Sequence, residues 1–152
     1  MDEIILIEDS DSDARLIQRS LQLAGVNNPV RQFWTGKEAL TFLAQAEKLA
    51  QKQDGNLPRI LFLDLKLPDS SGYEILMWLQ SRKAYAKALK IVLSQLEDIF
   101  SIKQAYALGA TTFLTKPATQ QELDELIRVY PTHWRLRGMQ AGQLALTSSS
   151  YR

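Results

Sequence analysis

Short apolar runs alternate along this chain with longer segments in which apolar residues recur every three or four positions. The runs cover residues 4–7, 30–34, 60–63, 91–93 and 112–114. Such runs are typical of strands, whereas the longer spacing is typical of helices. Residues at helical spacing are Leu16, Ile17, Leu21 and Ala24; Ala39, Leu40, Leu43 and Leu49; Ile75, Leu76 and Leu79; and Ile99, Ile102, Ala105 and Tyr106. The pattern predicts five strands, each followed by a helix.

The predicted strands are apolar almost throughout, not only at alternate positions. Strands of this kind are covered on both faces, which indicates a parallel sheet with helices on each side. Because crossovers between parallel strands are right-handed, only a few doubly wound topologies fit this order of elements. We therefore expect a doubly wound α/β fold.

Turn-forming residues separate the predicted elements. Gly25 and Pro29 bracket the end of the first helix. The stretch 48–58 is longer than a compact connection needs, so it is either an extended helix end or a mobile loop. The fifth helix is expected over residues 119–130. Residues 131–152 then form a C-terminal tail with three arginines and no acid, and we expect its last residues to be disordered.

Length and composition indicate one domain in residues 1–130, with no effector domain after it. A chain of 152 residues can form one sizeable core but not two. Its formal net charge of +1 gives no reason to expect nucleic acid or an anionic membrane as a partner. It has no cysteine, and it opens with MDEIILIE, which is neither a signal peptide nor a membrane span. We expect a cytoplasmic protein.

Polar residues follow four of the five predicted strands. Glu8 and Asp9 come after the first strand, Asp64 after the third, Ser94 after the fourth and Lys116 after the fifth. In an open parallel sheet the carboxyl ends of the strands share one edge, where ligands bind. These five residues are therefore expected to converge, although they are far apart in the sequence.

Three carboxylates close together repel one another and favour a bound cation. Magnesium is often held by one or two carboxylates, which Asp9 and Asp64 can provide, while Glu8 holds water bound to the ion. Lys116 and the ion would neutralise a phosphoryl group, and the Ser94 hydroxyl would donate to one of its oxygens. Asp64 remains as the nucleophile, since a carboxylate can accept a phosphoryl group as an acyl phosphate.

The acidic stretch EDSDSDA also resembles the start of a calcium-binding EF-hand loop, because Asp9, Asp11 and Asp13 stand at alternate positions. The sixth position of that loop needs glycine and holds Ala14. The twelfth position needs glutamate and holds Ser20. The sequence therefore excludes an EF-hand.

Taken alone, each candidate residue has a simpler interpretation. Glu8 and Asp9 fit the acidic start of a helix, and Ser94 fits a cap at a strand end. Asp64 also resembles the nucleophile of haloacid-dehalogenase-type phosphatases, but that family needs a second Asp where this chain has Lys66. The five residues together favour a phosphoacceptor site.

Four motifs in order resemble the receiver domains of bacterial two-component response regulators. The opening strand and acidic pair of that family are similar to ILIEDSDSDARLI. Its phosphoacceptor region looks like LFLDLKLPDSSGYEIL, with Pro68 and Gly72 at the usual offsets from Asp64. The strand with the switch hydroxyl is similar to KIVLS, and the last strand with its Lys-Pro pair is similar to LGATTFLTKP. The resemblance covers residues 1–130.

The resemblance implies a flavodoxin-like (βα)5 fold with strand order 2-1-3-4-5. It implies phosphotransfer from a histidine kinase to Asp64, with Mg²⁺ held by Glu8, Asp9, Asp64 and the backbone carbonyl of Lys66. Residues 10–13, which follow the acidic pair, are then expected to cap the first helix and to favour its positive end.

The family also implies a switch. Phe113 is the aromatic residue whose rotamer follows Ser94 when phosphate arrives, and the Lys116–Pro117 peptide is typically cis. With no effector domain, the output is expected to be a change of surface. The helix expected over residues 97–108 shifts, and a downstream protein binds the altered face.

The chain also looks similar to stand-alone regulators that are paired with cyanobacterial phytochrome kinases, through its long loop before the third strand and a tail containing Trp134. This subtype implies a phytochrome-type kinase as partner, and a homodimer formed through the fourth and fifth helices with the tail. We expect a phosphoacceptor, not an enzyme that acts on other molecules.

Two other classes of function remain as alternatives. One is an interaction module that keeps the fold without phosphorylation, although such relatives usually lose at least one of the five site residues. The other is a metal-dependent phosphatase, which would turn over an external phosphoester.

Overall fold

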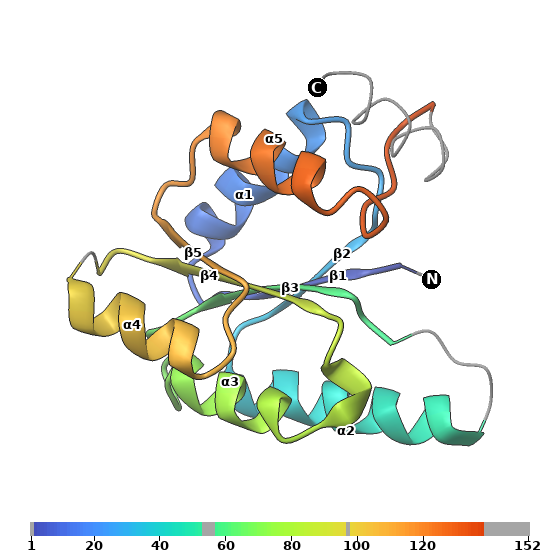
Figure 1. Ribbon diagram of the computed structural model, residues 1–152, viewed down its shortest axis with the longest axis vertical. Helices are drawn as coiled ribbons and strands as arrows, with labels where there is room; N and C mark the ends of the chain where they lie inside the picture. The colour runs from blue at the N-terminus through green and yellow to red at the C-terminus, as the bar shows by residue number, and fades with distance from the viewer. Residues whose placement is uncertain (1, 53–56, 97, 139–152) are drawn as a thin grey trace.

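Five strands form one parallel sheet in the order β2-β1-β3-β4-β5 (Figure 1). The strands are β1 (Ile4–Ile7), β2 (Val30–Phe33), β3 (Ile60–Asp64), β4 (Leu89–Ser94) and β5 (Thr112–Thr115). The helices are α1 (Asp11–Leu23), α2 (Gly36–Lys52), α3 (Gly72–Gln80), α4 (Ile99–Ala107) and α5 (Gln120–Val129), with a short 3-10 helix η1 (Lys83–Tyr85). The computed structural model describes residues 2–52, 57–96 and 98–138. The predicted fold and strand order are confirmed.

Helices α1 and α5 cover one face of the sheet, and α2, α3 and α4 cover the other (Figure 1). Because side chains alternate along a strand, each strand contributes to both cores. Ile4 and Leu6 of β1 belong to the core under α1 and α5, whereas Ile5 and Ile7 belong to the core on the opposite face. Burying one such side chain contributes about 1.5–3 kcal/mol. This two-sided burial explains why the strands are apolar throughout.

Side chains fix the positions at which three helices begin. The Ser10 hydroxyl accepts the backbone N–H of Asp13 at 3.2 Å at the start of α1. Asp98 caps α4 in the same way, and Thr119 forms a reciprocal capping box with Glu122 at α5. Each cap satisfies a backbone donor that has no partner inside the helix. The cap predicted for the first helix is therefore confirmed.

Some apolar residues at helical spacing do not face the core. Leu16 is 53% exposed, Leu49 is 60% exposed and Ile99 is 56% exposed. The reason is that the buried stripe of a helix is narrow. In α1 the buried stripe consists of Ala14, Ile17 and Leu21.

Helix α2 is long and continues to Lys52. Of the two alternatives for the stretch 48–58, an extended helix end is therefore correct for residues 48–52. Residues 53–56 lie outside the described ranges, as does Glu97, where the helix after the fourth strand was expected to begin. Among the described residues, no helix is long and apolar enough to cross a membrane.

The chain remains packed beyond α5, where the sequence predicts a tail. Trp134 is only 2% exposed and belongs to the core under α1 and α5. Its ring centroid lies 6.3 Å from that of Phe62 on β3. The tail residues 139–152, whose end was expected to be disordered, lie outside the described ranges.

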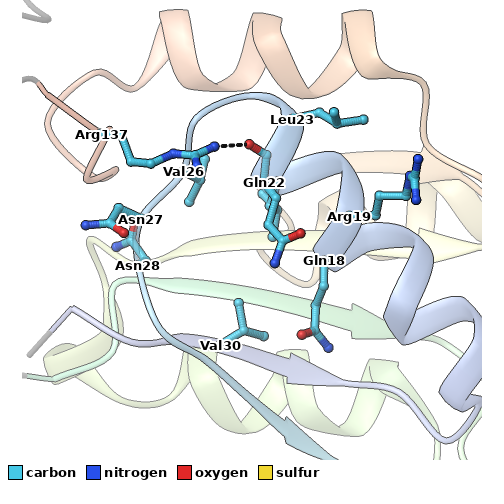
Figure 2. Close-up of a pocket in the computed structure, with 10 residues that line it drawn as sticks. Gln18, Arg19, Gln22, Leu23, Val26, Asn27, Asn28, Val30 and Arg137 are labelled. Atoms are coloured by element: carbon cyan, nitrogen blue, oxygen red, sulfur yellow. Dashed lines mark hydrogen bonds between the residues drawn. The ribbon is translucent and has the colours of Figure 1, made fainter.

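The segment after Trp134 is bonded to the connection between α1 and β2. The Asn27 N–H donates to the Arg135 carbonyl at 2.6 Å, and the Arg137 N–H donates to the Gly25 carbonyl at 2.9 Å. Figure 2 shows the Arg137 guanidinium donating to the carbonyl of Gln22 at 2.7 Å. The Gln22 carbonyl also accepts the Gly25 N–H at 3.0 Å, so Arg137 adds a second donor at the carboxyl end of α1.

Replacing Trp134 by alanine is expected to lower the free energy of unfolding by about 3–5 kcal/mol, because the change opens a cavity in the core. The control is Trp34→Ala, at a side chain that is 45% exposed, and it should cost much less. Urea unfolding followed by circular dichroism measures both variants. Equal losses would show that Trp134 does not anchor the segment after α5.

Candidate functional site

Four strand ends meet at one edge of the sheet and carry the five predicted residues. Asp64 and Ser94 are the last residues of β3 and β4, Glu8 and Asp9 follow β1, and Lys116 follows β5. The parallel registers keep these ends level with one another. All five residues line one pocket. The predicted convergence is therefore found in the structure, while the chemical roles of the residues remain predictions.

The three acids form a compact cluster of oxygen donors. Carboxylate oxygens of Glu8, Asp9 and Asp64 lie within 4.8 Å of one another. Glu8 and Asp64 are buried, whereas Asp9 is exposed. Three carboxylates with one side open to water suit a hard divalent ion that keeps part of its hydration shell. The residues present therefore fit Mg²⁺.

The Lys116 ammonium lies among carboxylates from three different parts of the chain. Its Nζ is 2.5 Å from Glu8 Oε1, 2.9 Å from Asp64 Oδ2 and 3.0 Å from Asp13 Oδ2. Burial alone would lower the pKa of Lys116, but the hydrogen bonds to these carboxylates outweigh burial and raise it. Lys116 is therefore charged at neutral pH. Its peptide bond to Pro117 is cis, as the resemblance implies.

Glu8 is the most deeply buried acid of the cluster, at 2% exposure. Burial raises its pKa to about 7, against the opposing effect of hydrogen bonds from Lys116 and from the Ser10 N–H. The like charge of Asp64 adds to the rise. The pKa of Glu8 is thus raised mainly because its carboxylate is buried, and only to a smaller extent by the neighbouring carboxylate of Asp64.

Ser94 and Phe113 occupy the positions predicted for a switch. The Ser94 hydroxyl is buried and accepts the N–H of Leu96 at 3.0 Å. Phe113 is partly buried against the core under α2, α3 and α4. Its N–H donates to the Tyr106 hydroxyl of α4 at 3.2 Å. These contacts connect the site to α4, and the switching roles remain predictions.

The loop after β3 forms another wall of the site. The Lys66 N–H donates to Asp64 Oδ1 at 3.1 Å, and the Lys66 side chain is exposed. At the start of α3, a Cβ on Gly72 would lie 2.4 Å from the Asp64 carbonyl oxygen. Only glycine lets α3 begin this close to the loop, which gives a physical reason for the spacing between Asp64 and Gly72.

Asp13 is a member of the site that the sequence did not identify. It was expected only to favour the start of the first helix, yet its carboxylate is bonded to Lys116. The signal available in the sequence is nearness to the predicted acidic pair, because Asp13 stands in the first turn of α1, shortly after Glu8 and Asp9.

Asp69 is a second carboxylate that the sequence did not single out. From the loop after β3 it accepts the backbone N–H groups of Gly36 and Lys37, both at 2.9 Å. The hydrogen bonds from Lys37 and Gly36 lower the pKa of Asp69. This contact ties the loop beside Asp64 to the start of α2. Its partners are more than thirty residues away in sequence, so no local pattern predicts it.

Comparisons with known proteins agree with this geometry. A family profile described as the response regulator receiver domain matches residues 4–128. The chain is 27% identical over 131 residues to the probable methanogenesis regulatory protein FilR2 of Methanothrix harundinacea, covering 86% of this chain and 82% of that protein. It is 25% identical over 131 residues to the response regulator Rcp1 of Synechocystis, covering 86% of this chain and 87% of Rcp1.

A solved structure extends the likeness to three dimensions. The phosphorylated cyanobacterial phytochrome response regulator RcpA matches with a TM-score of 0.68 at 28% sequence identity. The match covers 90% of this chain and 99% of RcpA. Sequence and structure therefore point to the same family.

Proposed function

The chain belongs to the response regulator receiver domain family, and on that premise we propose that it is a phosphoacceptor in two-component signalling. Asp64 takes a phosphoryl group from a phosphohistidine of a sensor histidine kinase. The observation that carries the proposal is the pocket in which Asp64 meets two further acids, a buried hydroxyl and a lysine. Phosphoryl transfer needs mainly positioning and charge neutralisation, which these groups can supply.

In the proposed transfer, a carboxylate oxygen of Asp64 attacks phosphorus and the P–N bond to the kinase histidine breaks. The electron pair of that bond returns to the imidazole, and Asp64 becomes an acyl phosphate. Before transfer, Lys116 is bonded to Asp64 Oδ2. Lys116 exchanges this bond for one to a phosphoryl oxygen, so that its charge stays beside the new anion.

Magnesium is part of this proposal because the acid cluster fits it. Asp9, Asp64 and the backbone carbonyl of Lys66 would hold the ion, with Glu8 beside them. When bound, the ion supplies positive charge that neutralises the phosphoryl oxygens. The relative Rcp1 has been crystallised in a Mn²⁺-bound form, which supports a divalent ion.

Ser94 would convert phosphorylation into a change of surface. Its hydroxyl oxygen accepts the Leu96 N–H, and its own proton can be donated to a phosphoryl oxygen. When Ser94 turns toward the phosphoryl group, the loop that leads to α4 follows, and Phe113 moves into the space that is left. A downstream protein then binds the altered face of α4.

The upstream partner in this proposal is a histidine kinase. RcpA is a phytochrome response regulator, which supports a kinase of the phytochrome type. The chemistry takes place on the protein's own Asp64, so the proposal includes no turnover of an external phosphoester. It also requires the cytoplasm, where ATP-dependent kinases act.

Incubation with acetyl phosphate and Mg²⁺ is expected to add one phosphoryl group, because this small donor can replace the kinase. Intact-mass spectrometry measures the adduct. Asp64→Asn is expected to give none, and omission of Mg²⁺ should strongly reduce it. The matched control is Asp124→Asn, at an exposed acid on α5, which should behave like the wild type.

The contrary outcome is a folded protein that forms no adduct and binds no beryllofluoride. That result would favour the interaction module that works without phosphorylation. Release of inorganic phosphate from an added phosphoester would instead favour the phosphatase.

Ser94→Ala is expected to uncouple α4 from phosphorylation. Beryllofluoride should shift the amide resonances of α4 in the wild type and shift them much less in the variant, since alanine cannot donate to the phosphoryl oxygens. Heteronuclear NMR measures the shifts, and Ser12→Ala, at an exposed hydroxyl, is the control. If the α4 shifts are the same in Ser94→Ala and the wild type, the proposed coupling is wrong.

A homodimer through α4, α5 and the tail is also part of the proposal. Ile99 and Phe100 on α4 are 56% and 81% exposed, and Val129 on α5 is 56% exposed. Burying these side chains would favour association. Sedimentation velocity with and without beryllofluoride should show a dimer that Phe100→Ala weakens. A monomer under both conditions would remove this part of the proposal.

A further inference from the structure

Lys116 has one carboxylate partner that lies outside the acid cluster. Its three N–H donors are bonded to Glu8, Asp64 and Asp13, so none is left over. Glu8 and Asp64 also belong to the cluster that fits a divalent ion, whereas Asp13 does not. Two of the three partners are therefore shared between the lysine and the ion, and Asp13 serves the lysine alone.

We infer that Asp13 is a positioning residue that holds Lys116 when a divalent cation occupies the acid cluster, and that it thereby sets the affinity for the cation. This inference rests on the proposed metal site. It assigns to Asp13 a role that the five predicted residues do not perform.

Lys116 and a cation in the acid cluster compete for the same carboxylate oxygens. With a cation in the cluster, Lys116 would have to share the carboxylates of Glu8 and Asp64 with it, and the two positive charges would repel each other. Lys116 then needs an acceptor that the cation does not use. Asp13 provides one at 3.0 Å without movement of the backbone.

The position of Asp13 suits this role. It lies in the first turn of α1, and its side chain is 30% exposed, compared with 2% for Glu8 and 11% for Asp64. A partly exposed carboxylate gives up less hydration than a buried one when it pairs with an ammonium group. Asp13 can therefore balance Lys116 at every stage of cation binding.

Removal of Asp13 should strengthen the competition between Lys116 and the cation. Lys116 would then have only Glu8 and Asp64 as anionic partners, and the cation would have to displace it from both. Asp13→Asn is expected to weaken cation binding by about tenfold, which corresponds to about 1.4 kcal/mol.

The simpler interpretation is that Asp13 only places negative charge at the start of α1. Asp11 provides the matched control, because it stands in the same first turn and is bonded to Trp34 and Gln32, not to Lys116. Asp11→Asn removes the same formal charge. It is expected to change cation affinity by no more than about twofold, since exposed charges are screened by salt.

The test is a titration of the full chain with Mn²⁺ at 0.15 M salt, near the ionic strength at which the Debye length is about 8 Å. Electron paramagnetic resonance of free Mn²⁺ gives the dissociation constant without any phosphodonor. The titration compares the wild type, Asp13→Asn and Asp11→Asn. Thermal unfolding without metal shows whether each variant is folded.

A double-mutant cycle with Lys116→Met identifies the cause. If Asp13 acts through the lysine, Asp13→Asn in the Lys116→Met background should lose its large effect and fall to the level of Asp11→Asn. Equal effects of Asp13→Asn and Asp11→Asn in the wild-type background would overturn the inference, as would an effect of Asp13→Asn that persists without Lys116.

The two proposals can fail separately. If the wild type binds no Mn²⁺, the proposed metal site fails, and the inference fails with it. If the wild type binds Mn²⁺ and Asp13→Asn binds it equally well, the metal site stands and only the role of Asp13 is wrong.

Discussion

The site depends on one partly buried ammonium group, that of Lys116, which holds together carboxylates that would otherwise repel one another. The Lys116 ammonium contacts carboxylates from the end of β1, the first turn of α1 and the end of β3. Removing such charges from water is costly, and a buried ion pair often contributes little net stability. We therefore expect this charged cluster to lower the free energy of unfolding, as functional sites commonly do, and the rest of the fold to offset that loss.

The stability that offsets this loss comes from two apolar cores, one on each face of the sheet. The same two-sided burial made the strands recognisable in the sequence, because residues such as Ile4 and Ile5 face different helices and are both apolar. The strand order came from the resemblance of four motifs, since periodicity alone leaves several doubly wound topologies open. Leu16 is exposed although it fits the helical spacing of apolar residues. The spacing therefore identifies a helix more reliably than it identifies which side of the helix is buried.

The sequence predicted those site residues that lie at the carboxyl ends of strands. Glu8, Asp64 and Lys116 each end a strand or follow one directly, so the rule for parallel sheets brings them together. Asp13 lies on a helix, and its contact depends on where the chain places Lys116, 103 residues away. Trp134 follows a proline in a polar, basic segment with no periodic pattern, so nothing local marks it as a core residue.

The anchoring of the chain after α5 determines the direction in which it leaves the fold. Residues 135 and 137 are bonded to residues 27 and 25, in the connection between the end of α1 and the start of β2, which lies at the amino ends of the strands. The pocket around Asp64 opens at the carboxyl ends of the strands. A fluorophore, affinity tag or fused protein attached directly to Gly138 would therefore start from the rim of the sheet opposite the pocket around Asp64.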